Sequence, residues 1–157
     1  GGKELGEDWV WKVSNQQEYN YNDFMQKKIT DSVSLMLKSG RKVVLVYPIP
    51  EVGWDVPSRL AKMYKLQGKL YPSDGSTSYQ RYIERNKNAY KALDAIGEHV
   101  NLIRFRPSKI LCNTYVKDRC VVHINSMPLY FDDDHLTDLG AHMVIRGIFA
   151  ELNRHKM

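Results

Sequence analysis

The sequence of 157 residues has no long apolar run. No segment approaches the roughly 20 consecutive apolar residues that a membrane-spanning helix needs. The N-terminus lacks the apolar core of a signal peptide. We therefore expect any export or membrane signal to lie outside this chain. Internal repeats and low-complexity tracts are also missing, so we do not expect a repeat architecture.

Charge of one sign is not concentrated in the chain either. Lys and Arg number 23 and Asp and Glu number 18, which gives a formal net charge of +5, and the basic residues are scattered. This distribution favours an ordinary solvated surface, so we expect no nucleic-acid partner. With 43% hydrophobic and 26% charged residues, the composition is globular and suits a single domain over residues 1–157.

Cysteine is scarce, with only Cys112 and Cys120 present. They flank a polar segment that could close as a small loop. A disulfide between them fits an oxidising compartment and two reduced thiols fit a cytosolic one, and the spacing leaves both open. A zinc site is disfavoured, because two cysteines lack the usual paired spacing and the nearby His123 sits in an apolar run.

The residues that are present alternate between strand-like and helical patterns. Short apolar runs, of the kind buried on both faces of a parallel sheet, predict strands at 43–47, 100–105 and 120–124, with a weaker candidate at 9–13. Apolar residues at helical spacing predict helices from about Asn22 to Gly40, over 58–66, from Tyr79 to near Gly97, and over a last segment carrying Leu136 to Leu152. This alternation predicts an α/β three-layer sandwich that binds ligands beyond the carboxyl ends of its strands.

The long connection from Glu51 to Ser78 follows the first good strand. Long loops at that edge of an α/β sheet often shape a substrate pocket, and the alternative is an ordinary surface excursion.

The most informative stretch runs from Pro128 to Ala141, where three acids precede a histidine between an apolar run and an amphipathic helix. Asp132 and His135 are three residues apart, so in a turn entering a helix both side chains point to the same side. A carboxylate so placed fixes the tautomer of an imidazole whose other nitrogen takes a proton from a serine hydroxyl. We expect Asp132 to orient the ring, His135 to act as general base, and Asp133 and Asp134 to cap the helix.

Two other interpretations of this stretch stay open. In one, the acids cap a helix and the histidine is incidental. In the other, Asp132, Asp134 and His135 coordinate a metal, although the sequence shows no further ligand cluster and we predict no metal site.

These residues also carry a family resemblance. The segment 128–141 resembles the closing block of SGNH-type hydrolases and acyltransferases, whose shared element is Asp-x-x-His. More narrowly, residues 130–137 with Gly140 and Ala141 resemble the C-terminal SGNH domain attached to membrane acyltransferase-3 proteins, which O-acetylate cell-surface polysaccharides. Residues 44–53 are similar to that family's strand ending in a proline-rich turn, and the two cysteines match its cysteine pair. The resemblance spans roughly residues 42–148. It implies a flavodoxin-like SGNH-hydrolase sheet and a disulfide between Cys112 and Cys120.

The chain departs from the family at the nucleophile. The family's serine lies in a Gly-Asp-Ser block on the first strand, and no Gly-Asp-Ser occurs here. Ser76 ends a segment with those letters in another order, in a polar loop without a preceding apolar strand, so we reject it as nucleophile. Neither Asn15 nor Asn22 has the glycine context of the family's oxyanion asparagine. We therefore expect a partial SGNH domain that is missing its first strand or strands and the serine, with residues 1–21 poorly matched and residues 22–157 forming the α/β core.

The resemblance implies the C-terminal part of an O-acyltransferase domain that transfers an acetyl group to a polysaccharide or lipopolysaccharide hydroxyl. Acetyl-CoA would be the ultimate donor through a membrane domain of the same parent chain, so we expect no cofactor in this chain. The location would be the periplasmic side of a bacterial inner membrane.

Flat aromatic side chains near the expected site suggest an acceptor surface. Tyr47, Trp54 and Tyr130 are candidates for lining it, because such faces suit sugar rings, and the alternative is that they belong to the core. Two rival functions stay open. One is a self-contained carbohydrate esterase that uses Ser126 or Ser76, and the other is a catalytically silent glycan-binding module.

Overall fold

The computed structural model describes residues 21–155. The weaker strand candidate at 9–13, Asn15, and residues 1–20 of the segment expected to match poorly lie outside the described residues. The elements follow in the order α1 (Tyr21–Lys38), β1 (Val43–Val46), α2 (Val56–Gln67), β2 (Thr77–Ser78), α3 (Tyr79–Asp94), β3 (Leu102–Phe105), α4 (Ser108–Leu111), β4 (Arg119–Cys120), β5 (His123–Ile124), β6 (Met127–Pro128) and α5 (Asp138–Arg154).

The four predicted helices are all present, and local chemistry explains several of their ends. Gly40 follows α1 with a φ of 78°, a left-handed conformation that glycine adopts without strain. The side chain of Asp55 caps α2 by accepting a hydrogen bond from the Ser58 amide at 2.8 Å. Gly68 ends the same helix with a φ of 73°. Ser78 caps α3 in the same way as Asp55 caps α2, through the Arg81 amide.

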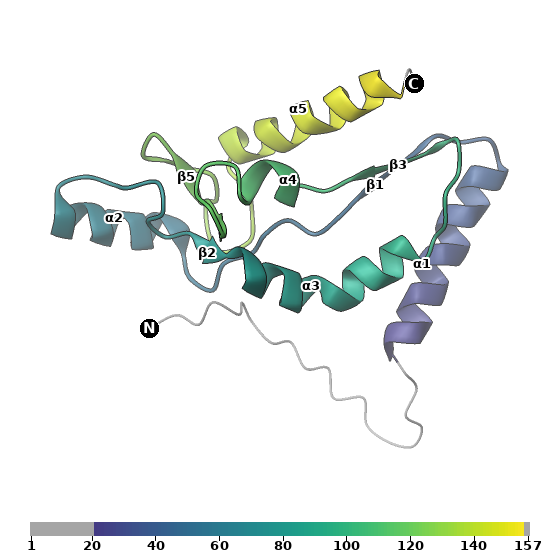
Figure 1. The fold of residues 1–157 in the computed structure, drawn as a ribbon, viewed down its shortest axis with the longest axis horizontal. Helices are drawn as coiled ribbons and strands as arrows, with labels where there is room; N and C mark the ends of the chain where they lie inside the picture. Colours follow the sequence, from purple (N-terminus) through teal and green to yellow (C-terminus); the bar gives the residue numbers. More distant parts are fainter. Residues whose placement is uncertain (1–20, 156–157) are drawn as a thin grey trace.

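Strands β1 and β3 form a parallel pair in which Val43 lies opposite Leu102 and Val46 opposite Phe105. Helices α1 and α3 lie on one side of this pair and α5 on the other (Figure 1). On the α1 and α3 side, buried side chains form one core cluster: Val33, Leu37, Leu45, Tyr47 and Leu102. On the α5 side the helix approaches closely at Gly147, where an added Cβ atom would lie 2.8 Å from the Phe105 ring.

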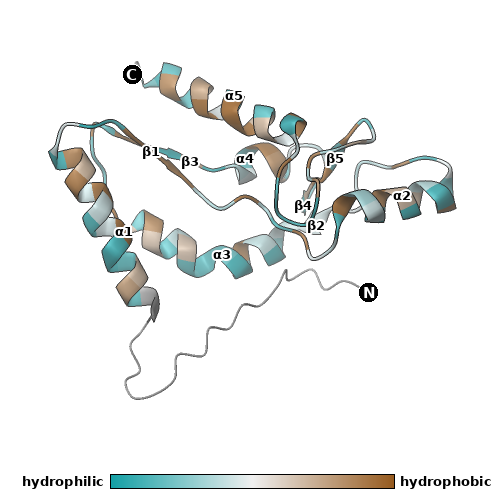
Figure 2. Ribbon diagram, turned by 180° about the vertical axis from the view of Figure 1, so that it is seen from behind, coloured by the Kyte–Doolittle hydropathy of each residue, from teal (hydrophilic) through white to brown (hydrophobic). Residues whose placement is uncertain are grey.

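The described part of the chain therefore has mixed helix and strand content, a small parallel sheet, and helices on both of its faces. Figure 2 shows hydrophobic residues along β1 and β3 and on parts of the flanking helices. Over residues 21–155 the parallel sheet has two strands, so the full three-layer sandwich remains a prediction.

The prediction of one parallel strand over 120–124 is wrong. Strand β4 pairs antiparallel with β2, and β5 pairs antiparallel with β6. Between them Val121 and Val122 are buried in a second core cluster, beside Leu111 and the α2 residues Val56 and Leu60. This apolar run is thus buried by packing against helices and loops, which gives the same composition as burial within a sheet.

The predicted disulfide is present between Cys112 and Cys120. Both residues are buried beside Tyr82 of α3. The bond closes the polar segment 113–119 directly ahead of the β5–β6 hairpin. It therefore fixes the part of the chain that leads into the acidic stretch.

Candidate active site

Residues 131–137, which we call the dyad loop, connect the β5–β6 hairpin to α5. The loop is held by the segment that follows the carboxyl end of β1. The amide of Val52 donates to the Asp133 carbonyl at 3.0 Å, and the amide of Val56 donates to the Asp132 carbonyl at 3.1 Å. The Tyr130 hydroxyl donates to the Pro50 carbonyl at 2.7 Å. The proline-rich segment after β1 thus sets the position of the loop through backbone groups.

Thr137 caps α5, so the prediction that Asp133 and Asp134 cap this helix is wrong. The Thr137 hydroxyl accepts from the Gly140 amide at 3.3 Å and donates to the Pro128 carbonyl at 3.0 Å. A short side chain that makes both bonds ties the helix start to the hairpin. Gly140 permits this close approach, because a Cβ atom there would overlap the Leu129 carbonyl oxygen.

Asp132 and His135 form the expected dyad. Asp132 Oδ2 lies 2.8 Å from His135 Nδ1, while Asp132 Oδ1 accepts the amides of Asp134 at 3.0 Å and His135 at 2.7 Å. An ionised carboxylate only accepts hydrogen bonds, so Nδ1 carries the proton in the neutral ring and Nε2 keeps a lone pair. Among residues 21–155, no group is hydrogen-bonded to Nε2. The ring is therefore oriented at one nitrogen and open at the other.

The His135 ring is at the surface and supported from one side. Its side chain is 66% exposed. The Phe131 ring stacks on it with a centroid distance of 5.5 Å and an interplanar angle of 22°. Stacking and the Asp132 hydrogen bond fix the ring plane while Nε2 faces away from the carboxylate. A partner molecule can reach that nitrogen.

Electrostatics in the dyad loop favour the ion pair. Hydrogen bonding by the His135 amide, with further help from the Asp134 amide and the imidazole, lowers the pKa of Asp132 to about 2. The pKa of His135 is raised, chiefly by its hydrogen bond to Asp132 and then by the charges of Asp132 and Asp134. Asp134 acts at short range, since its Oδ1 lies 2.8 Å from His135 Nδ1.

The metal interpretation has three ligand atoms within reach. One atom each from Asp132, Asp134 and His135 lie within 4.8 Å of one another, and this cluster includes no fourth such residue from the described residues. The dyad uses the same carboxylates to hold a proton on Nδ1, which explains their positions without a cation. We therefore keep the proton-transfer interpretation.

Two of the three aromatic acceptor candidates belong to the core. Tyr47 is 2% exposed, and its hydroxyl donates to Asp94 while the Arg106 guanidinium lies 4.3 Å from its ring centroid. Tyr130 is 0% exposed. Neither ring offers a face to a sugar, because both are enclosed by neighbouring side chains. Trp54 is partly exposed, donates to the Gly75 carbonyl at 3.0 Å, and stays a candidate.

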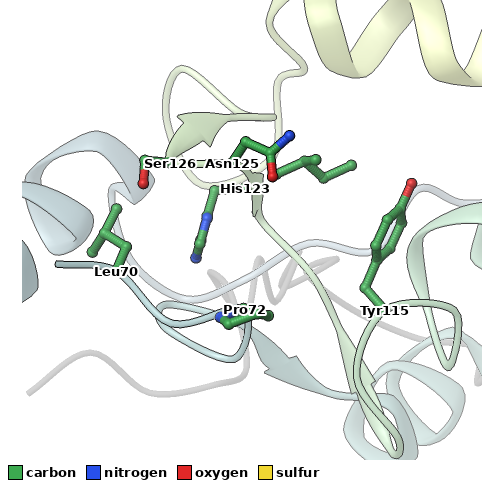
Figure 3. Close-up of a pocket in the computed structure, with 7 residues that line it drawn as sticks. Leu70, Pro72, Tyr115, His123, Asn125 and Ser126 are labelled. Atoms are coloured by element: carbon green, nitrogen blue, oxygen red, sulfur yellow. The ribbon is translucent and has the colours of Figure 1, made fainter.

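The two serines considered as internal nucleophiles lie in other surroundings. Ser76 is 2% exposed, and its hydroxyl donates to the Ser73 carbonyl and accepts from Arg119 Nε at 2.9 Å. Ser126 lies at the β5–β6 turn and lines a cavity beside His123 (Figure 3). Within the described residues, no serine hydroxyl is hydrogen-bonded to His135.

Comparison with known protein families shows which family the chain belongs to. A family model described as SGNH domain (fused to AT3 domains) matches residues 5–149. The chain belongs to this SGNH family. The match confirms the resemblance to SGNH domains of acyltransferase-3 fusions, and it begins well before residue 42. No curated protein and no solved structure matches the chain.

Membership has consequences for the protein around this SGNH domain. The family is described by fusion to AT3 domains, so this SGNH domain is of the acyltransferase-associated kind. Over residues 21–155, no helix combines the length and apolar character needed to cross a bilayer.

Three contributors to the site were not predicted from the sequence. The amides of Val52 and Val56 hold the dyad loop, yet backbone donors leave no mark on residue identity. Phe131 supports the imidazole ring. Its place beside the acidic stretch was the one available signal, because an aromatic residue four positions before a histidine can stack on it when the chain turns.

Proposed function

We propose that this SGNH domain supplies the acid–base part of an O-acyltransferase site, transferring an acetyl group to a hydroxyl of a cell-surface polysaccharide or lipopolysaccharide. The observation that carries the proposal is the His135 ring, which is held by Asp132 at 2.8 Å and open at Nε2. The nucleophilic serine would come from outside this chain. The acetyl group would come ultimately from acetyl-CoA through the membrane domain of the parent, on the periplasmic side of a bacterial inner membrane.

Each residue of the dyad has one task in this reaction. The serine oxygen attacks the carbonyl carbon of the acyl donor while His135 Nε2 takes the hydroxyl proton, and the leaving group departs with that proton. The acceptor hydroxyl then gives its proton to Nε2 as its oxygen attacks the acyl-serine, and the proton returns to the serine oxygen. Asp132 keeps the ring in the productive tautomer and stabilises the imidazolium formed in each half-reaction.

The chain itself needs to bind no coenzyme for these steps, because proton transfer is the whole of its chemistry. Trp54 is the remaining aromatic candidate for contact with the acceptor, since its indole is partly exposed and lies in the segment that also holds the dyad loop.

The decisive experiment is His135→Ala in the full-length parent protein, with acetyl incorporation into the polysaccharide as the measurement. We expect transfer to fall by several orders of magnitude. His142→Ala is the matched control, because His142 is an exposed histidine of α5 outside the dyad loop and its removal should leave transfer unchanged. Near-normal transfer by the His135 variant would reject the proposal.

The same variants separate the rival functions. A self-contained esterase would hydrolyse an activated acetate ester with this chain alone, and that turnover would depend on Ser126 or Ser76. A silent glycan-binding module would bind glycan and leave transfer by the parent unaffected when His135 is replaced. The proposal predicts neither result.

A further inference from the structure

Two hollows on the described surface flank the β5–β6 turn and lie outside the dyad loop. One cavity of about 350 Å³ is lined by Leu70, Pro72, Tyr115, His123, Ile124, Asn125 and Ser126. Figure 3 shows Leu70, His123 and Pro72 on one side of it and Tyr115 on the other, with the turn residues at one end. A second cavity of about 370 Å³ shares Leu70 and Ser126 and extends toward α2. Both volumes fall in the range of small-molecule sites, which is roughly 300 to 1,000 Å³.

The first cavity has no charged residue in its lining. Its polar groups are an amide, a serine hydroxyl, a phenol and an imidazole, and the rest of the lining is apolar. Such a surface offers hydrogen bonds in both directions and no counter-ion, so a charged ligand would lose its hydration without compensation. A saccharide unit, with hydroxyl groups around an apolar ring, matches this combination.

His123 has a buried nitrogen without a partner. The residue is 4% exposed, and its Nε2 lies 2.9 Å from the Tyr71 carbonyl oxygen. Because a carbonyl only accepts, Nε2 carries the proton and Nδ1 presents a lone pair. Nδ1 is buried and has no hydrogen-bond partner. Unpaired buried polar atoms are uncommon and costly, so the His123 ring is an unusual group in the wall of this cavity.

The turn itself keeps a hydroxyl where glycine is the usual residue. Asn125 and Ser126 have φ values of 50° and 66°, which is the conformation of a two-residue type I′ turn. That turn favours Asn followed by Gly. Serine is strained in the second position, and Ser126 lines both cavities.

The second cavity shares its supports with the dyad loop. Pro57 and Pro128 line this cavity. Val56, next to Pro57, donates its amide to the Asp132 carbonyl, and the Pro128 carbonyl accepts from the Thr137 hydroxyl. The start of α2 and the hairpin therefore position both the second cavity and the dyad. A saccharide bound in this cavity would lie in a fixed position relative to His135.

We propose that the two cavities beside the β5–β6 turn form a subsite for an uncharged saccharide unit of the acceptor, with the His123 ring in the cavity wall and a ligand hydroxyl bonded to Ser126. The proposal deepens the function above and rests on it for the nature of the acceptor.

The binding test uses this chain with isotope-labelled histidine and follows the ring signals by NMR during titration with glucose, galactose, mannose and rhamnose. We expect at least one of these sugars to shift the His123 signals in a saturable way. The exposed His99 and His142 serve as internal controls and should not move. Glucuronate is the charged comparison and should bind more weakly than glucose. No saturable shift at His123 with any sugar, or equal binding of glucuronate, would overturn the proposal.

Ser126→Gly is the matched variant, because glycine suits the turn and removes only the hydroxymethyl group. Folding should be preserved, and affinity for the sugar should fall roughly 2- to 10-fold, the effect of one neutral hydrogen bond. In the parent protein the variant should raise the KM for the acceptor, whereas His135→Ala lowers kcat. Unchanged affinity would overturn the role of Ser126. If Ser126→Gly weakens sugar binding while His135→Ala leaves transfer unchanged, the proposed function is rejected and the subsite is retained.

Discussion

Replacement of Asp132 by asparagine tests the dyad more sharply than removal of the histidine, because the structure predicts the orientation of the new amide. Asp132 Oδ1 accepts two backbone amides, at 2.7 and 3.0 Å. Only the oxygen of an asparagine amide can keep those bonds, so its NH₂ group would face His135 Nδ1. The ring must then accept at Nδ1 and carry its proton on Nε2. In that tautomer it has no lone pair for a serine proton.

The expected loss in kcat is on the order of 10³ to 10⁴, by analogy with the same substitution in a serine protease triad. This corresponds to about 4 to 5.5 kcal/mol of transition-state stabilisation. The pH profile gives a second measure. A base must be neutral, so transfer by the unmodified protein rises with pH through the raised pKa of His135. In the asparagine variant the main cause of that raised pKa is gone, so the inflection moves to lower pH while the plateau falls.

Two assays check this reasoning. Long-range ¹H–¹⁵N spectra of the histidine-labelled chain report the tautomer of His135 directly, and acetyl transfer by the parent reports the rate. Asp134 Oδ1 lies 2.8 Å from the same nitrogen, so Asp132→Asn combined with Asp134→Asn removes the second carboxylate. The assignment would be refuted if the double variant kept its proton on His135 Nδ1. It would also be refuted if Asp132→Asn showed near-normal transfer.

Two further predictions concern the frame that holds the site. Replacing Cys112 and Cys120 together by alanine should lower the free energy of unfolding by about 2.5 kcal/mol, because the bond closes a loop with a sequence separation of 8. Urea denaturation of both proteins measures this difference. Two free thiols in the unfolded, unreduced protein would contradict the disulfide. Gly140→Ala should cost about 1 to 3 kcal/mol, because the new Cβ overlaps the Leu129 carbonyl and displaces the start of α5. An unchanged urea midpoint would show that α5 does not need this close approach.

Features of local sequence were predicted well. Gly40, predicted to end α1, adopts a left-handed conformation, and β1 and β3 follow from short apolar runs. The pairing of Cys112 with Cys120 came from the family resemblance, since spacing alone left it open. The Asp-x-x-His spacing was sufficient to place Asp132 against His135, because a single tight turn determines that contact.

Features that depend on distant parts of the chain were not predicted. Residues 120–124 are as apolar as a central strand, but Val121 and Val122 bury their side chains against α2 and α4 residues. Residue type could not reveal that Tyr47 and Tyr130 are enclosed while Trp54 is partly open. In each case the residue type predicts that a side chain is buried but does not predict which element it packs against.

The three consecutive aspartates show the same limit within one turn. Asp132 contributes its carboxylate, which binds the imidazole and two amides. Asp133 contributes its backbone carbonyl, which accepts the Val52 amide. Asp134 contributes both an amide that holds Asp132 and a charge beside Nδ1. Three identical residues thus have three different roles because the turn directs each of them toward a different partner. Substitution of Asp133 by asparagine should therefore be the mildest of the three changes, since its backbone contact survives.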